Sequence, residues 1–424
     1  FSSSAASDVY KRQILHMLRN YLGDDAFFAG LNDYLKTNEY GTGEAQQLRL
    51  SLEKISGKDL NWFFNQWYYG SGNPKLSYTS SYEPVKKQAT LTLNQTQTPL
   101  FQFPLTVDVY EGGKVSRQKV WASAKASNSF TFPANSNPTF FNINADGVLL
   151  ADINDSTTAA QYLLQYQNSK DFLSRYKAVE FASKNNTDDN SLKILSAALK
   201  DSSFRIRMKA LEGIDLSKPN AQKMMAAEVE KLAQNDPKTL VQGAAIAALA
   251  KTKDRKYLPI FEKGLNAVST SVKGNSLGAI SQIDPSRVPA LADKIDLDGA
   301  SDELIAQLLP TIVKNKIEKQ MPAVATTAAF YPFLKFQDPQ LGTAAEEAYN
   351  WIMSSDNLKA TENLTKILNQ AKGQVAQNPQ AKMMIVQMLR EGLAKKTQVL
   401  KANPQSKTIN QQIDLINRTI EAYK

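Results

Sequence analysis

The first long pattern of apolar positions, from Ile14 to Gly72, has the period of helices. Apolar side chains recur three and four residues apart in four short stretches, which places each set on one face of a helix. Glycine follows three of these stretches, and Asp24 or Asp25 is placed to cap the second helix. We therefore predict four short amphipathic helices. Their apolar positions are Ile14, Leu15, Leu18 and Leu22; Phe27, Phe28, Leu31, Tyr34 and Leu35; Leu48, Leu52 and Ile55; and Leu60, Phe63, Phe64, Trp67 and Tyr68.

After Asn73-Pro74 the apolar period changes to two, which is typical of strands. The longest alternation runs from Phe101 to Val109, and Pro104 on its other face indicates an edge strand or a bulge. Gly112-Gly113 predicts a hairpin turn, and Asp146-Gly147 predicts a second tight turn. Several short strands in roughly eighty residues favour a small β-sandwich. The predicted strands lie at 76–78, 89–93, 101–109, 115–121, 129–132, 140–144 and 148–151.

From about Thr157 to the end the pattern is helical again, and part of it repeats. A basic or polar residue, followed three and four residues later by a small and an apolar residue, recurs every 31 to 35 residues or so. Asp201 and Asp236 precede two of these copies and are expected to cap helices. The arrangement resembles the inner helices of HEAT-type repeats, whose stacked pairs form an α-solenoid. The copies begin at Arg175, Arg207, Gln242 and Lys273, and later helices are expected at 301–314, 340–353, 379–396 and 408–423.

The composition removes most of the usual catalytic side chains. Among 424 residues there are 1 His and 0 Cys, which excludes disulfides, zinc fingers and a catalytic cysteine. A zinc site with two histidines cannot be built within this chain, and a Ser-His-Asp triad would have to use His16.

The net charge of +9 comes from scattered lysines, so we expect a solvated surface and no nucleic-acid groove. No apolar run reaches the ~18 residues of a membrane-spanning helix. Residues 1–13 lack the basic and apolar regions of a signal peptide.

Residues 1–13 have no regular apolar period. Ser3 to Gln13 reads as the translation of a transposase-type sequencing adapter, so we expect this segment to be foreign to the protein. The alternative is a natural flexible N-terminus.

Residues 14–74 carry an ordered set of motifs that resembles the zinc aminopeptidases of the aminopeptidase N family (gluzincins). In that family such motifs end the catalytic domain, and a β-sandwich and a helical solenoid follow. The resemblance implies a multidomain, mainly α protein: the C-terminal helical part of a metallopeptidase catalytic domain at 14–73, a β-sandwich at 74–153 and a HEAT-like α-solenoid at 156–424. The motifs are Ile14-Leu-His-Met-Leu-Arg19, Leu22-Gly-Asp-Asp-Ala-Phe-Phe28, Gly30-Leu31, Tyr34-Leu35, Ser56-Gly-Lys-Asp-Leu60, Phe63-Phe-Asn-Gln-Trp67 and Gly72-Asn-Pro74.

The family's catalytic motifs are absent from the sequence. An H-E-x-x-H helix and a later glutamate bind zinc in that family, and a Gly-x-Met-Glu-Asn segment binds the substrate's amine. The family's transition-state tyrosine would align at about Asp8, and Tyr10, two positions away, is not its equivalent. We therefore assign no catalytic residue and no metal ligand, and leave the substrate-binding residues unknown.

Other candidate residues each have a structural and a functional interpretation. His16 is either a packed helix residue or a pH-sensitive group, and Asp24-Asp25 either caps a helix or binds a metal. Trp62, Trp67, Tyr68 and Tyr69 either form core or stack on a ligand, with Trp62 or Tyr69 at an edge. The structural interpretation is preferred for each, including two lysine pairs expected to be solvated and two methionine pairs expected to fill gaps between helices. These pairs are Lys86-Lys87, Lys395-Lys396, Met224-Met225 and Met383-Met384.

Two functions follow. The first is the C-terminal fragment of a zinc-dependent metalloaminopeptidase that removes N-terminal residues from peptides; zinc and peptide substrates belong to the full-length parent, and the fragment is expected to be inactive and to bind none. The alternative is a non-catalytic HEAT-type protein-binding scaffold. Relatives with this architecture are often exported by bacteria, which suggests the cell envelope. The oligomeric state, the compartment and the residue preference are left open.

Overall fold

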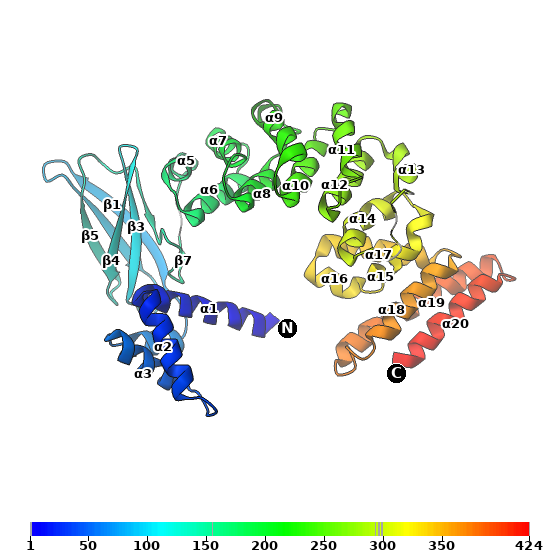
Figure 1. Cartoon of the computed structure of the whole chain (residues 1–424), viewed down its shortest axis with the longest axis horizontal. Coiled ribbons are helices and arrows are strands. Elements are labelled where there is room, and N and C mark those ends of the chain that lie inside the picture. The colour runs from blue at the N-terminus through cyan, green and yellow to red at the C-terminus, as the bar shows by residue number, and fades with distance from the viewer. Residues whose placement is uncertain (1, 155, 293, 296, 298–299, 424) are drawn as a thin grey trace. The chain divides into compact units, whose positions relative to one another are not determined.

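The computed structural model describes residues 2–154, 156–292, 294–295, 297 and 300–423 (Figure 1), with only the backbone described for residues 2–10. The chain divides into two compact units, residues 1–194 and 195–424. None of the helices in the described parts of the chain is both long and apolar enough to cross a membrane.

Unit 1 begins with a helical segment of five elements. Although residues 1–13 have no regular apolar period, the first helix begins at Ser2. These residues contain no proline or glycine that would stop a helix from extending backwards from Ile14. The elements are α1 (Ser2–Leu22), α2 (Asp24–Thr37), α3 (Ala45–Ser56), α4 (Asn61–Phe63) and the π-helix η1 (Phe64–Tyr68).

The capping prediction for the second helix was also wrong. Gly23, with φ of 88°, is the N-cap of α2, and no side chain bonds the free N–H groups there. Asp24 and Asp25 lie inside the first turn, where negative charge is favourable next to the helix dipole. Gly57 ends α3 in the left-handed conformation, with φ of 66°, as the sequence predicts.

Within the described residues, seven strands form two sheets. One sheet has four strands in the order β5-β2-β1-β7, and the other has three in the order β4-β3-β6. Gly112 and Gly113 both have positive φ in the hairpin that joins β3 to β4, so this turn prediction is confirmed. The strands are β1 (Lys75–Glu83), β2 (Gln88–Gln95), β3 (Phe103–Glu111), β4 (Lys114–Ala122), β5 (Ser127–Pro133), β6 (Phe140–Ile143) and β7 (Asp152–Ile153).

Two strand predictions were wrong. β3 is the central strand of its sheet and pairs with β4 without a bulge; Pro104 is tolerated because β6 pairs only with residues 107–110. Residues 148–151 form no strand, because the Asn144 side chain bonds both backbone groups of Leu149. The Asn144 amide donates to the Leu149 carbonyl at 2.9 Å, and the Asn144 side-chain oxygen accepts from the Leu149 N–H at 3.0 Å.

One hydrophobic core joins the helical segment to both sheets. Met17 and Leu18 from α1, Leu52 from α3 and Trp67 from η1 are buried in the same cluster as Leu91 and Val107 of the sheets. In Figure 1 the helices α2 and α3 lie at one end of the strands. Unit 1 ends with α5 (Ala159–Asn168), α6 (Phe172–Lys184) and the first part of α7 (Asp189–Ala198).

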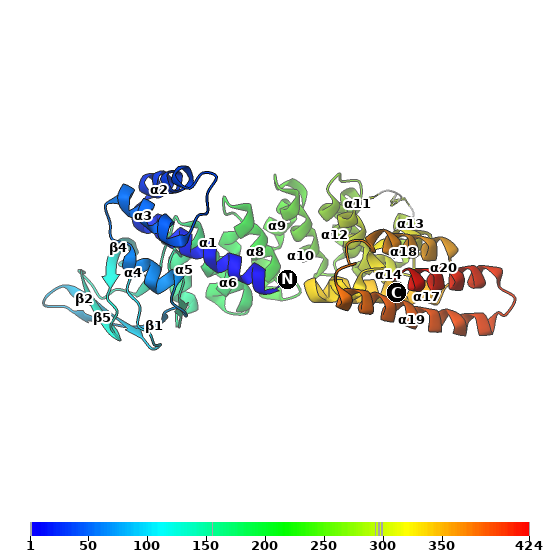
Figure 2. The same cartoon turned by 90° about the horizontal axis from the view of Figure 1, so that it is seen from below.

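Unit 2 is helical throughout its described secondary structure, and helices close in chain order contact one another, for example α8 with α10, α10 with α12 and α12 with α14. Figure 2 shows α8, α10 and α14 following one another in this order. The later helices predicted from the sequence are present, although α19 runs past its predicted end to Ala402. The α-helices are α8 (Phe204–Gly213), α9 (Pro219–Asn235), α10 (Thr239–Ala250), α11 (Leu258–Gly264), α12 (Thr270–Ile283), α13 (Val288–Ala292), α14 (Asp302–Lys314), α15 (Met321–Ala328), α16 (Tyr331–Gln337), α17 (Pro339–Met353), α18 (Leu358–Ala371), α19 (Pro379–Ala402) and α20 (Lys407–Tyr423), with short 3-10 turns η2 (Arg255–Tyr257), η3 (Pro285–Arg287) and η4 (Glu318–Gln320).

The repeated motif of unit 2 forms a recurring set of bonds. Arg207 on α8 donates to both carboxylate oxygens of Asp236, at 2.7 and 2.9 Å, and to the Asp201 carbonyl at 2.8 Å. Gln242 makes the equivalent bond to the Asp236 carbonyl at 2.7 Å. Asp236 also accepts from the Lys238 N–H at the start of α10. Asp236 therefore bonds the residue that precedes α10 and not an N–H group of the helix itself, so the prediction that it caps this helix was wrong. Its carboxylate instead receives the guanidinium of Arg207 from α8.

Candidate functional site

The candidate metal and acid–base residues are exposed and separate. His16 lies on the surface of α1 with its ring 3.3 Å from the Asn20 amide. Asp24 forms an exposed ion pair with Arg19, at 2.7 Å, and that hydrogen bond lowers the pKa of the carboxyl. Within the described residues no group of three His, Cys, Asp or Glu side chains could hold a metal ion. The described side chains therefore do not fit a zinc ion. The side chain of Tyr10 lies outside the described residues.

The aromatic residues of the fourth motif separate into buried and exposed sets. Phe63, Phe64 and Trp67 are buried, as the preferred interpretation expects, whereas Tyr68 and Tyr69 are exposed. The motif does not form one regular helix, because α4 passes into the π-helix η1 at Phe64. Single π-helical turns are frequent at functional sites because they change the direction in which side chains point.

The π-helix is fixed to the sheet by a pair of hydrogen bonds. The Gln66 amide donates to the Gln102 carbonyl and its oxygen accepts from the Gln102 N–H, both at 2.9 Å. Trp67 packs on Phe101, with the ring centroids 5.0 Å apart. These contacts hold the Trp67 side chain at the junction between the helical segment and β3.

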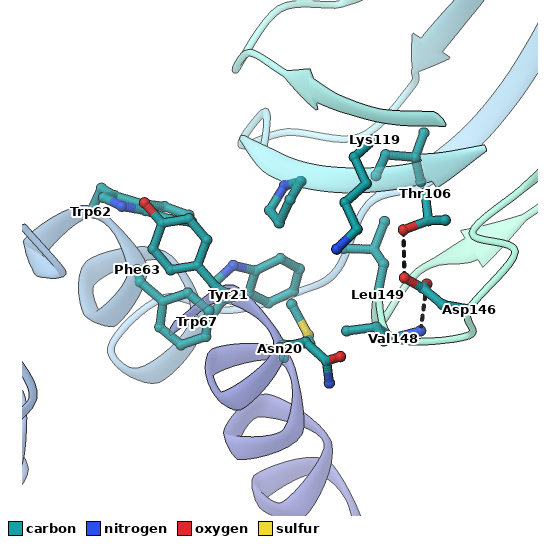
Figure 3. Close-up of a pocket in the computed structure, with 13 residues that line it drawn as sticks. Asn20, Tyr21, Trp62, Phe63, Trp67, Thr106, Lys119, Asp146, Val148 and Leu149 are labelled. Atoms are coloured by element: carbon teal, nitrogen blue, oxygen red, sulfur yellow. Dashed lines mark hydrogen bonds between the residues drawn. The ribbon is translucent and has the colours of Figure 1, made fainter. Parts of the chain in front are cut away.

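A cavity of about 230 Å³ opens at this junction (Figure 3). Tyr21, Trp62, Phe63 and Trp67 gather on one side of it, and Lys119, Thr106 and Asp146 lie on the other. Trp62 contacts Tyr21 edge to face at a centroid distance of 5.5 Å and Trp121 at 5.2 Å. Trp62 lines the cavity, whereas Tyr69 does not.

The polar side of the cavity comes from the second sheet and the loop that follows it. Asp146 accepts from the Thr106 hydroxyl at 2.5 Å and from the Val148 N–H at 3.2 Å. The side chain of Lys119 on β4 makes no ion pair or hydrogen bond in the described part of the chain. The indole N–H of Trp67 is buried and also has no partner there. Buried N–H groups are nearly always bonded, so an unpaired one calls for an acceptor.

Thr106, Lys119 and Asp146 were not predicted from the sequence as neighbours. They come from β3, β4 and a loop, and only the pairing of these strands with the helical segment brings them to one cavity. The aromatic half was present in the sequence as a motif of closely spaced rings. No pattern in the local sequence indicated that the aromatic and the charged sides of the cavity lie together.

The first lysine pair is solvated as predicted, whereas the second is not: Lys395 is half-buried and donates to the Asn350 side chain. Lys86 and Lys87 are exposed, as expected, and Lys86 pairs with Glu83 at 2.9 Å. Lys396 is fully buried, so the prediction that it is solvated was wrong. Its ammonium donates to the carbonyl oxygens of Ile352, at 2.9 Å, and Ser355. Burial lowers its pKa to about 8.

The methionine pairs only partly fill helix interfaces. Met225 is buried on α9, whereas Met224 and Met383 are exposed. Adjacent residues of a helix point about 100° apart, so only one member of such a pair can face the same neighbour. The gap-filling prediction was therefore wrong for Met224 and Met383.

One protein family matches the N-terminal part of this chain. Residues 7–67 match the model described as "Peptidase family M1 domain". The match covers all the motifs of the helical segment except Gly72-Asn-Pro74, and it begins within the segment 1–13. Residues 7–67 are therefore similar to this class of peptidase.

Within that class the chain is similar to aminopeptidase N. It is 37% identical over 65 residues to aminopeptidase N of Lactococcus lactis subsp. lactis, covering 15% of this chain and 8% of that protein. It is 32% identical over 108 residues to the tricorn protease-interacting factor F2 of Thermoplasma volcanium, covering 24% of this chain and 13% of that protein. The matched segment is thus a small part of each of these relatives. The aminopeptidase N-like resemblance seen in the motifs is confirmed.

A solved structure supports the fold along most of the chain. A crystal structure of Legionella pneumophila aminopeptidase A in complex with aspartic acid matches with a TM-score of 0.51 and 14% sequence identity. The match covers 96% of this chain and 56% of that one. At this identity the likeness concerns the fold alone, and it supports a mainly helical chain with small sheets.

Proposed function

We propose that this chain is the C-terminal part of a zinc-dependent metalloaminopeptidase that removes N-terminal residues from peptides. In this proposal, the zinc ligands and catalytic residues of the parent lie upstream of residue 14. The peptidase family match at 7–67 and the similarity to aminopeptidase N support this function over a protein-binding scaffold.

The observation that carries the proposal is the apolar surface of the helical segment. Scattered exposed apolar residues are normal, whereas a concentration of them marks an interaction surface. Eight large apolar side chains at least 40% exposed lie between residues 15 and 69, and nine exposed ones are spread over the rest of the described chain. The eight are Leu15, Phe28, Leu35, Tyr40, Leu50, Ile55, Tyr68 and Tyr69.

This surface fits the remainder of a catalytic domain as its partner. The helical segment buries one face against the sheets and leaves a second set of apolar residues in solvent. A short helical segment that ends a larger domain has to present such a second face, because a domain is built around a shared core. The proposed occupant is the upstream catalytic portion of the same parent protein.

The proposal divides the chain into four parts. Residues 1–13 are a non-native segment, 14–73 end the catalytic domain, 74–153 form a β-sandwich, and 156–424 form a HEAT-like α-solenoid. The two sheets that share one core support the sandwich. The recurring bonds of Arg207 and Gln242 to the preceding turn support the repeat.

The nucleotide sequence upstream of Ile14 tests the function most directly. We expect it to encode H-E-x-x-H, a downstream glutamate and Gly-x-Met-Glu-Asn in one reading frame. A continuous reading frame without these motifs would overturn the proposal and favour the scaffold.

An activity assay is the second test. The purified chain, supplied with zinc, should not hydrolyse aminoacyl-naphthylamides, whereas the extended protein should. Turnover by the chain alone that disappears in His16→Ala would show that the chain has its own catalytic centre, and the proposal would be wrong.

A further inference from the structure

The cavity beside Trp67 has two chemically different walls. Tyr21, Trp62 and Phe63 form an apolar wall from the helical segment. Lys119 and Asp146 bring one positive and one negative group to the opposite wall. Figure 3 shows the Lys119 side chain extending toward the cavity on the same side as Asp146.

Among the described residues, neither the exposed Lys119 ammonium nor the half-buried Asp146 carboxylate has a partner of opposite charge. The side chain of Lys119 makes no ion pair or hydrogen bond in the part that the structure describes. Asp146 is held in place by the neutral donors of Thr106 and Val148, and each of its oxygens retains a free lone pair. A ligand that carries one negative and one positive group close together complements both.

The indole N–H of Trp67 is a third group at the cavity that lacks a partner. Its side chain is 5% exposed and lines the cavity, yet its indole N–H has no acceptor among the described residues. An indole N–H only donates, so the missing partner must be an acceptor such as a carboxylate oxygen.

We propose that this cavity binds a free α-amino acid with an apolar side chain. The α-carboxylate accepts from Lys119 and from the Trp67 indole, the α-ammonium faces Asp146, and the side chain packs on Tyr21 and Trp62. A volume of about 230 Å³ lies below the ~300–1,000 Å³ of pockets for drug-sized ligands, so it suits a molecule of this size.

The placement of the charges selects an amino acid over simpler ligands. A fatty acid would leave Asp146 without a partner, and an alkyl amine would leave Lys119 and the Trp67 N–H without one. An α-amino acid carries both charges at one end and an apolar group at the other, which matches the two walls. This inference does not depend on the proposed function, because every group involved lies within the chain.

Isothermal titration calorimetry of the whole chain with L-leucine tests the proposal. We expect saturable binding of leucine and much weaker binding of leucinamide, which lacks the carboxylate, and of 4-methylpentanoate, which lacks the ammonium. Lys119→Gln should weaken leucine binding about tenfold, the usual effect of losing a hydrogen bond to a charged group. Lys114→Gln, an exposed lysine on the same strand that does not line the cavity, is the matched control and should bind as the parent does.

A spectroscopic measurement tests the indole separately. The chain has 4 Trp, so a protein labelled with ¹⁵N in tryptophan gives four indole resonances, and Trp67→Phe identifies the relevant one. Leucine should move that N–H resonance downfield as it gains an acceptor. Absence of saturable heat and of this shift at millimolar leucine would overturn the proposal, and so would equal affinities of Lys119→Gln and Lys114→Gln.

Discussion

Replacing the buried Lys396 by methionine should leave the stability unchanged or raise it at pH 7, and should lower it near pH 10.4. Burial lowers the pKa of this lysine to about 8, whereas a lysine in an unfolded chain has a pKa near 10.4. One pKa unit corresponds to about 1.4 kcal/mol, so the charged form reduces the free energy of unfolding by about 3 kcal/mol. This penalty is fully present below pH 8 and is relieved as the pH rises toward 10.4, because the folded state releases its proton first.

Methionine removes both the charge and the donor. The Ile352 carbonyl still accepts from the Ser355 N–H at 3.2 Å and from its hydroxyl at 2.9 Å. The Ser355 carbonyl loses the lysine donor, at a cost of about 1–3 kcal/mol. At pH 7 Lys396→Met should therefore be about as stable as the parent or more stable, and near pH 10.4 it should be less stable by about 1–3 kcal/mol.

The assay is urea unfolding followed by circular dichroism across this pH range. Lys401→Met, at an exposed position in the last turn of the same helix, is the control for losing one lysine from α19. Its difference from the parent should not change with pH. If the difference between the parent and Lys396→Met is also constant from pH 7 to 10.4, the lowered pKa and the reasoning built on it are wrong.

Three further changes test other parts of the fold. Asp236→Asn leaves the buried Arg207 guanidinium without a charged partner and should reduce the free energy of unfolding by about 3 kcal/mol, measured by thermal unfolding; an unchanged melting temperature would contradict this. Leu35→Glu should reduce the binding of an apolar fluorescent dye if the helical segment presents a docking surface, whereas Val268→Glu, in unit 2, should leave dye binding nearly unchanged; equal reductions would count against the surface. Asn144→Ala removes both bonds to the 149 backbone and should cost about 1–3 kcal/mol, with faster amide exchange at residues 146–150; unchanged exchange would contradict the role of that side chain.

The sequence predicted the elements whose pattern is local. The four apolar stretches at 14–68, the Gly112-Gly113 hairpin and the last helix at 408–423 all follow from spacing and turn residues. Pro104 was misinterpreted because a single residue cannot reveal how far a neighbouring strand extends along β3.

The predictions that failed depend on contacts between distant residues. Residues 148–151 alternate like a strand, but the Asn144 side chain takes up the Leu149 backbone groups first. Lys396 looks like a surface lysine until α19 packs on α17 and places it against the carbonyls of that helix. The charged half of the cavity was missed for the same reason, since Lys119 and Asp146 meet the aromatic residues only in the folded unit.

The bond between Arg207 and Asp236 makes part of unit 2 sensitive to changes in chain length. These residues are 29 positions apart, and Arg255 and Asp284, which also form an ion pair, are separated by the same number. An extra residue within α9 would turn the following chain by about 100° and move Asp236 away from its guanidinium. Insertions and deletions during evolution should therefore accumulate in the stretch between these two intervals, around residues 251–254, and be rare inside them.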